Sequence, residues 1–373
     1  MNSQSLGPKE KDFLCAVALN ALIPLARDRT LQSAYHILRG RKANQTLQDV
    51  HLYSLYPYYR LFPRITKEEW EKIILYFMNK GYINNIPVNI GSAKPSFLVT
   101  EAGMSFAEER FAFYELQKWF EPFSRELPTH DLDVFWQRLH LLVQTVSQIA
   151  AGDLQFLPVV RDRAVQQWVK RQLPDPARRK RWEMHLGEEL YRLWEPLAEE
   201  LQKLLVAQLS GAEQAGRTMT QLAAMSNQAP SFLQVKFRYA LAVSMERLRR
   251  EKAAFPLLRG LVQDSGKADV RLSDSASRTY ALLVRGIPKE EIARIRGIKE
   301  STVEDHLVEI ALRCPEWDCS DLLPPDLANL IVQTKERLGT SRLRLIRDQL
   351  QGKVTYLQIR LALARQQGEG RHA

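Results

Sequence analysis

The chain has 373 residues, enough for two or three domains with apolar cores of their own. Lysine and arginine outnumber aspartate and glutamate by 53 to 43, so a polyanion such as nucleic acid is a candidate partner. The sequence has no apolar run of about 18 residues, which argues against a membrane-spanning helix.

The first predicted helix lies in the apolar stretch that follows Asp12. Pro24 interrupts this stretch and charged residues follow it, a pattern typical of a buried helix rather than a signal peptide. Three helices are then predicted at 30–40, at about 47–56 and at about 66–80. In the third, Thr66 is a suitable N-cap and Glu69 its expected capping-box partner.

A β-hairpin is predicted after these helices. Residues 82–90 and 96–100 resemble two short strands, and 91–95 form the expected turn with Lys94 at its tip. A helix followed by such a hairpin is the arrangement of a winged helix. From about 104 to 255 the pattern is helical throughout, with breaks expected at 127–129, 152–153, 174–176 and 211–216.

Two segments of this helical region allow more than one interpretation. Residues 216–241 fit either a second helix-turn-helix-like unit or two ordinary amphipathic helices. The basic segment 171–182 fits either a solvated loop or a phosphate contact.

A polar stretch at 264–278 predicts a domain boundary, and a helix-turn-helix pattern follows it. Ser273 or Ser275 is the expected N-cap of the first helix, at 275–285. Two further helices are expected at 288–296 and 299–313. The small or branched apolar residues that the core of this motif requires are Ala293, Ile298, Val303 and Leu307.

Two parts of the sequence resemble accessory modules of RecQ-family helicases. EIARIRGIKESTVEDHL (291–307) and VTYLQIRLALA (354–364) resemble the C-terminal helix-turn-helix module. LRGRK (38–42), TKEEWEKIILYFMNKGYI (66–83) and FLVTEAG (97–103) more distantly resemble the RecQ C-terminal winged helix. The whole arrangement is similar to a Bacillus-type family of helix-turn-helix proteins, typically encoded beside a RecQ-type helicase gene.

The resemblance implies a mainly α-helical chain in three parts. These are a RecQ-C-terminal-like winged helix at 1–105, a helical domain of unknown role at 106–263 and a RecQ-type C-terminal helix-turn-helix domain at 273–366. The four-cysteine zinc platform that precedes the winged helix in RecQ helicases has no counterpart in this sequence, which has three cysteines.

The sequence contains no motif for catalysis or for a bound cofactor. GxxxxGK[ST], GxSxG and HExxH are all missing, and no GxGxxG follows a strand. Cys314, Cys319 and His306 could surround a metal, but without a fourth ligand nearby reduced thiols are the favoured interpretation. We therefore expect a cytoplasmic protein with no enzymatic activity, catalytic residue, metal or cofactor.

The predicted DNA-reading helix at 299–313 is acidic. Glu300, Glu304 and Asp305 would meet phosphates if this helix entered a major groove, which disfavours sequence-specific binding. These carboxylates form either a solvated face or a surface that docks onto a basic protein partner.

Positive charge is concentrated in two other places. Within 337–365, seven basic side chains are opposed by Asp348 alone, and Arg342, Arg344 and Arg347 could form a stripe along one helix. Such arginines either contact phosphates or are solvated. By resemblance to the RecQ winged helix, the DNA-contacting set near the N-terminus is Arg39, Arg41, Lys42, Lys67 and Lys94.

The leading hypothesis is a non-catalytic adaptor. It would bind a RecQ-type DNA helicase, and forked or single-stranded DNA through phosphate contacts, in replication or repair. The alternative is a helix-turn-helix transcription regulator, which predicts a dimer and one preferred palindromic site.

Overall fold

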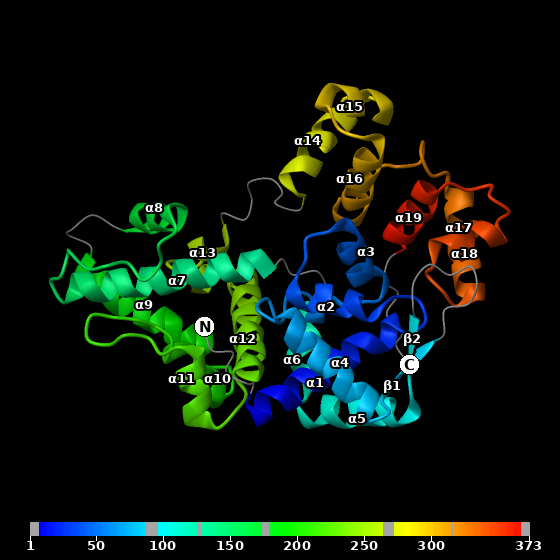
Figure 1. The fold of residues 1–373 in the computed structure, drawn as a ribbon. Helices are drawn as coiled ribbons and strands as arrows, with labels where there is room; N and C mark the ends of the chain where they lie inside the picture. The colour runs from blue at the N-terminus through cyan, green and yellow to red at the C-terminus, as the bar shows by residue number, and fades with distance from the viewer. Residues whose placement is uncertain are drawn as a thin grey trace. The chain divides into compact units, whose positions relative to one another are not determined.

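The computed structural model describes residues 7–86, 96–124, 129–173, 179–263, 272–314 and 316–366. Within these ranges the chain is mainly α-helical, as predicted, and its one sheet is a two-stranded antiparallel hairpin (Figure 1). The predicted turn at 91–95, with Lys94, lies outside the described residues.

Contacts between residues divide the chain into two compact units, each made of two separate stretches. Unit 1 comprises residues 1–15 and 110–268, and unit 2 comprises residues 16–109 and 269–373. The division at 268/269 falls within the polar stretch that we predicted as a domain boundary. Unit 2 groups the predicted winged helix with the predicted C-terminal domain, and the assignment of three separate domains stays a prediction.

Two helices, α1 (Pro8–Leu22) and α5 (Glu101–Phe113), contribute residues to both units. Residues 13–19 of α1 are almost fully buried, which confirms the expected buried helix. Its end coincides with Pro24, where a single 3₁₀ turn (Ile23–Leu25) replaces the α-helix.

Unit 1 contains helices α6 to α13. Their bounds are α6 Leu116–Phe120, α7 Thr129–Ala150, α8 Arg163–Gln172, α9 Arg179–Trp194, α10 Glu199–Val206, α11 Met219–Ser226, α12 Pro230–Arg250 and α13 Gly260–Gln263. The long helix α12 packs against α6, α7, α9, α10 and α11, so its apolar residues form the centre of the unit.

Three helices precede the hairpin in unit 2: α2 (Leu31–Arg39), α3 (Asn44–Leu52) and α4 (Lys67–Asn79). The capping box of α4 forms as predicted, with the backbone N–H of Glu69 donating to Thr66 Oγ1 at 3.1 Å. The predicted end of α3 near residue 56 is wrong. Helix α3 ends at Leu52, and Ser54 at φ +52° turns the chain out of the helical direction. A separate 3₁₀ turn (Tyr56–Tyr58) follows, with Pro57 in its first turn.

The hairpin consists of β1 (Ile83–Ile86) and β2 (Ser96–Val99), with Ile83 opposite Val99 and Ile86 opposite Ser96. Helix α4 leads directly into β1 and packs against it. This is the element order that we predicted for a winged helix, with shorter strands in the described part than the sequence indicated.

The helix-turn-helix is made by α14 (Asp274–Leu283), α15 (Lys289–Arg296) and α16 (Glu300–Arg313). Of the two expected caps, Ser273 caps α14, because its hydroxyl accepts the N–H of Ala276 at 3.2 Å. Gly297 ends α15 at φ +60°, a left-handed conformation that glycine adopts without a steric penalty.

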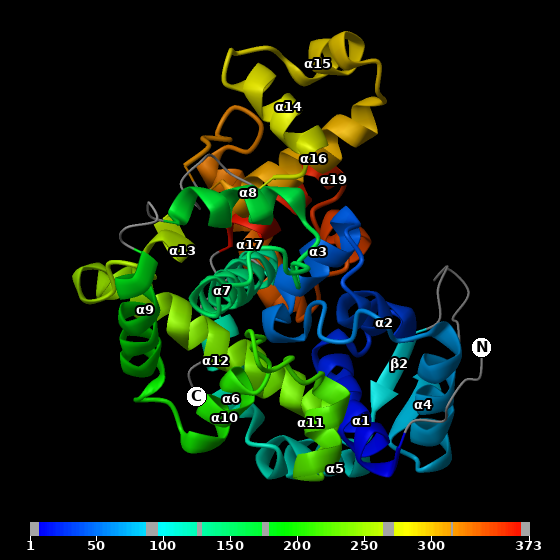
Figure 2. The same ribbon diagram turned by 90° about the vertical axis from the view of Figure 1, so that its left-hand side faces the viewer.

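Three more helices complete this part of unit 2: α17 (Pro325–Leu338), α18 (Leu343–Gln349) and α19 (Tyr356–Arg365). Helix α16 packs against α14, α15, α19 and α3 (Figure 2). The four residues predicted for the core of the motif lie in or against one apolar cluster with residues of α19: Ala293, Ile298, Val303 and Leu307.

Candidate nucleic-acid interface

Helix α16, the predicted DNA-reading helix, is largely enclosed by its own unit. Val303, Leu307 and Val308 are fully buried, and among residues 300–313 only Glu300 and Ser301 are exposed. A helix that reads a major groove presents a series of side chains along one open face. Here only the first turn of α16 offers such a surface.

The predicted acidic surface is split by the fold. Glu304 accepts a hydrogen bond from Lys289 of α15 at 3.1 Å, and Asp305 pairs with Arg360 of α19 at 2.5 Å. Glu300 is exposed at the first turn. Two of the three carboxylates therefore hold α15 and α19 against α16, and Glu300 remains for contact with another molecule.

Two further polar residues of α16 act inside the unit. Glu309 is only 6% exposed and accepts hydrogen bonds from the backbone N–H of Ser273 at 2.5 Å and from its hydroxyl at 3.0 Å. His306 is buried and its Nδ1 lies 2.9 Å from Thr279 Oγ1. Burial lowers the pKa of His306 and the nearby charge of Arg296 lowers it further, so the ring is neutral at pH 7.

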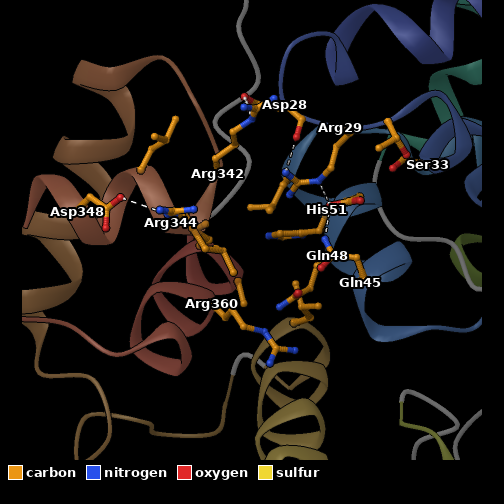
Figure 3. Close-up of a pocket in the computed structure, with 18 residues that line it drawn as sticks. Asp28, Arg29, Ser33, Gln45, Gln48, His51, Arg342, Arg344, Asp348 and Arg360 are labelled. Carbon is orange, nitrogen blue, oxygen red and sulfur yellow. Dashed lines mark hydrogen bonds and ion pairs between the residues drawn. The ribbon is translucent and has the colours of Figure 1, made fainter. Parts of the chain in front are cut away.

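The three arginines predicted as a stripe near α18 lie in three different surroundings. Arg342 is the N-cap of α18 and reaches Asp28, with Nε 3.9 Å from Oδ1 (Figure 3). Arg344 is 71% exposed and pairs with Asp348 one turn along the same helix. Arg347 lies over the ring of Tyr356, with Cζ 4.8 Å from its centroid.

The N-terminal basic residues, by contrast, form a cluster on the surface. Arg39, Arg41 and Lys42 are all exposed where α2 ends. Arg60 joins them, because its backbone N–H donates to the carbonyl of Ile37 at 3.0 Å. We call Arg39, Arg41, Lys42 and Arg60 the α2 basic cluster.

Two titratable groups report on the charge of this cluster. Burial lowers the pKa of His36, and the neighbouring guanidinium groups of Arg41 and Arg39 lower it further. Burial raises the pKa of Tyr59, an effect that Arg313 of α16 and Arg60 oppose. Several cations thus act on one small region of unit 2, which favours the approach of an anion.

The other predicted residues of the N-terminal set are placed differently. Lys67 is exposed and pairs with Glu71 on the same helix at 3.6 Å, and the two side chains are mostly solvated. Lys94 lies outside the described residues. Its role in contacting DNA stays a prediction.

Sequence reasoning missed a second group of cations, on the helix-turn-helix itself. Arg278, Arg285 and Arg296 line a shallow hollow of about 400 Å³ between α14 and α15. Burial lowers the pKa of Arg296, and the charge of Arg278 contributes in the same direction. The signal was available, since Arg278 and Arg285 are seven residues apart within the helix predicted at 275–285 and would share one face of it.

The cysteines and acidic groups of the described residues form no metal site. No group of three His, Cys, Asp or Glu side chains there could hold a metal ion. Burial raises the pKa of Cys15 to about 12, so this thiol is unreactive. No helix in the same part of the chain is long and apolar enough to cross a membrane.

Comparisons with known proteins agree with the C-terminal architecture. Residues 275–363 match the family model described as a helix-turn-helix domain, so this part of unit 2 is a helix-turn-helix domain, and such a domain suggests DNA binding. The chain is also similar to Protein YpbB of Bacillus subtilis (strain 168), with 26% identity over 367 residues. That alignment covers 95% of this chain and 98% of the relative. No solved structure matches the chain.

Proposed function

We propose that this protein is a non-catalytic accessory factor that binds DNA without reading its sequence and acts with a RecQ-type helicase in replication or repair. The observation that carries this proposal is the use of α16. Its acidic and apolar side chains hold the domain together, while exposed cations gather at the α2 basic cluster.

Phosphate contacts explain DNA binding by such a surface. Arginine and lysine side chains at the end of α2 can contact phosphates of any sequence, which positions a protein on DNA without selecting a site. The hollow lined by Arg278, Arg285 and Arg296 offers a further place for a phosphate on the helix-turn-helix.

The helicase part of the proposal rests on the resemblance to RecQ accessory modules. Glu300 is the exposed member of the predicted acidic surface, so it is the residue of that set placed to meet a basic partner. A carboxylate at the start of a helix also interacts favourably with the helix dipole.

The DNA part is tested by measuring affinity of the full chain for random duplex, single-stranded and forked DNA at several salt concentrations. We expect a preference for forked or single-stranded DNA, and no sequence among a randomised pool that is enriched. Selection of one palindromic sequence would instead identify a transcription regulator.

The helicase part is tested by recovering partners of the tagged chain from nuclease-treated extract of the same organism. We expect a RecQ-type helicase among the retained proteins, and much less of it with Glu300→Lys. Glu71→Lys, another exposed glutamate of unit 2, is the control and should leave recovery unchanged. Absence of the helicase from the unmodified chain would overturn this part.

A further inference from the structure

A pocket of about 730 Å³ lies within unit 2, apart from both groups of surface cations. One side is formed by α3 and the residues just before and at the start of α2, and the other by α18 and α19 (Figure 3). Its volume falls in the range of about 300 to 1,000 Å³ that is typical of small-molecule sites.

Apolar side chains form much of the wall of this pocket. These side chains belong to α3, α16, α18 and α19: Leu52, Leu312, Leu343, Leu345, Leu363 and Ala364. Such a surface favours a flat apolar group, which would be removed from water when it enters.

One polar side chain of the pocket lacks a partner. Gln48 of α3 is 7% exposed, lines the pocket and forms no side-chain hydrogen bond with any described residue. Its neighbour Gln45 differs, since it donates to Asp49 at 2.9 Å. The amide of Gln48 is therefore free to form hydrogen bonds with a ligand in the pocket.

The chemistry of an amide restricts what that ligand can be. A glutamine side chain presents a donor and an acceptor in one plane, which matches the hydrogen-bonding edge of a nucleobase. An apolar side chain of another protein could pack against the same leucine residues, but it would leave the amide of Gln48 without a hydrogen-bond partner.

Arg344 supplies the same pocket with a cation that a phosphate can contact. Arg344 lines the pocket and is mostly exposed, and its pair with Asp348 joins side chains on consecutive turns at 3.7 Å. Exposed pairs of this kind contribute little to stability, so a phosphate can replace Asp348 as the partner of Arg344.

We propose that this pocket binds one nucleotide: the base lies against the leucine side chains, its edge pairs with the amide of Gln48, and its phosphate contacts Arg344. The nucleotide is either free or an unpaired residue of a DNA strand. For the DNA strand, the inference rests on the DNA binding proposed above.

The test compares two forked DNAs that differ only in the single-stranded arm, which carries either ordinary nucleotides or abasic sites. We expect the full chain to bind the ordinary fork at least about five times more tightly than the abasic one. Only the ordinary fork has unpaired bases in its single-stranded arm. Gln48→Met keeps the shape of the side chain and removes its amide, and should bring the two affinities to within about twofold.

A merely structural role of Gln48 predicts a different pattern. Gln48→Met should leave the melting temperature unchanged or raise it, since it removes an amide that forms no hydrogen bond with a described residue. Gln32→Met is the matched control, because Gln32 lies on α2 in the same unit, is half-buried and does not line the pocket. It should keep the preference for the ordinary fork.

Calorimetry with deoxyadenosine monophosphate and with deoxyadenosine distinguishes the two sources. Saturable binding of the free nucleotide, weakened about tenfold by Arg344→Ala or by loss of the phosphate, would place a free nucleotide in the pocket. If the chain binds the two forks equally tightly and does not bind the free nucleotide, the nucleotide site is wrong, while the proposed DNA binding is still supported. If no DNA binds at all, the proposed function fails, and calorimetry alone decides the pocket.

Discussion

At the scale of single residues, two buried glutamates accept hydrogen bonds from backbone N–H groups of other segments of their units. Glu309 accepts hydrogen bonds from Ser273, the residue that caps α14, and Glu189 in unit 1 accepts the backbone N–H groups of Leu257 and Leu258. Hydrogen bonds from backbone N–H groups to an ionised carboxylate are stronger than those between neutral groups. These side chains are therefore structural, although acidic residues on a helix suggest solvated positions.

Glu309→Ala should lower the free energy of unfolding of the chain by about 2 to 3 kcal/mol, because the N–H of Ser273 loses its charged acceptor. Urea denaturation followed by circular dichroism measures this change. Glu300→Ala, at the exposed end of the same helix, should change it by no more than about 0.5 kcal/mol. Equal losses for the two variants would contradict the role of Glu309.

One buried histidine and three half-buried ones make stability depend on pH. Burial lowers the folded-state pKa of His306, and likewise those of His36, His51 and His140. The unfolded chain therefore binds protons first as the pH falls below about 6.5, and stability decreases from there downward. Melting temperatures between pH 7.5 and 5 should fall, and less steeply in His306→Gln than in the unmodified chain. A flat profile would contradict this.

At the scale of elements, α16 and the end of α2 depend on close contacts. Two ion pairs join α16 to α15 and α19. At the end of α2, Gly40 has φ +78°, and a Cβ there would come within 2.6 Å of Arg60 Cβ. The glycine thus allows Arg60 to lie beside the end of α2, which assembles the α2 basic cluster.

Asp305→Lys should lower the free energy of unfolding by about 1 to 2 kcal/mol, since it places a like charge beside Arg360, whose side chain is 16% exposed. Glu300→Lys, whose carboxylate is exposed, should have a smaller effect. Both are measured by urea denaturation. Equal stability of the two variants would show that the ion pair between Asp305 and Arg360 does not stabilise the fold.

Gly40→Ala should cost more stability than Gly297→Ala. Both glycines have positive φ, so alanine costs about 1 kcal/mol at either position. At Gly40 the added methyl group also meets Arg60, which adds about 1 to 3 kcal/mol, whereas at Gly297 nothing lies within 4 Å. Thermal unfolding of the two variants measures the difference. Equal losses would argue against close contact between Gly40 and Arg60.

At the scale of the whole molecule, the net charge is +10, and some of the basic side chains are paired with carboxylates while others are exposed. Arg342 and Arg360 pair with aspartates from distant parts of the sequence, Asp28 and Asp305, so much of the charge counted in 337–365 is neutralised within unit 2. We therefore expect the α2 basic cluster to contribute more to the proposed binding of DNA than the arginine-rich C-terminal segment does.

Arg39→Ala combined with Arg41→Ala should reduce the slope of log affinity against log salt by about 2 for duplex DNA, because two phosphate contacts are lost. Fluorescence anisotropy at several salt concentrations measures the slope. Lys203→Ala with Lys252→Ala, two exposed lysines of unit 1, removes the same charge and should leave the slope nearly unchanged. Equal reductions would show that net charge alone governs binding.

Local sequence patterns determined most of the elements. Capping residues, glycines and the spacing of apolar side chains act over a few residues, so the three helices of the helix-turn-helix, its core and the capping box at Thr66 were all predictable. The partners of the charged side chains could not be predicted from such local patterns. Whether Asp305 faces solvent or Arg360 depends on a contact 55 residues away in sequence.

The pocket and the α2 basic cluster were decided by tertiary structure for the same reason. Arg60 joins the cluster because the chain folds back onto the end of α2. Gln48 and residues of α18 line one pocket because the two stretches of unit 2 pack together. Sequence alone determined that this is a helical protein with a helix-turn-helix and an excess of positive charge. Only the fold decided which charges are neutralised and which remain on the surface, because pairing depends on distance in space.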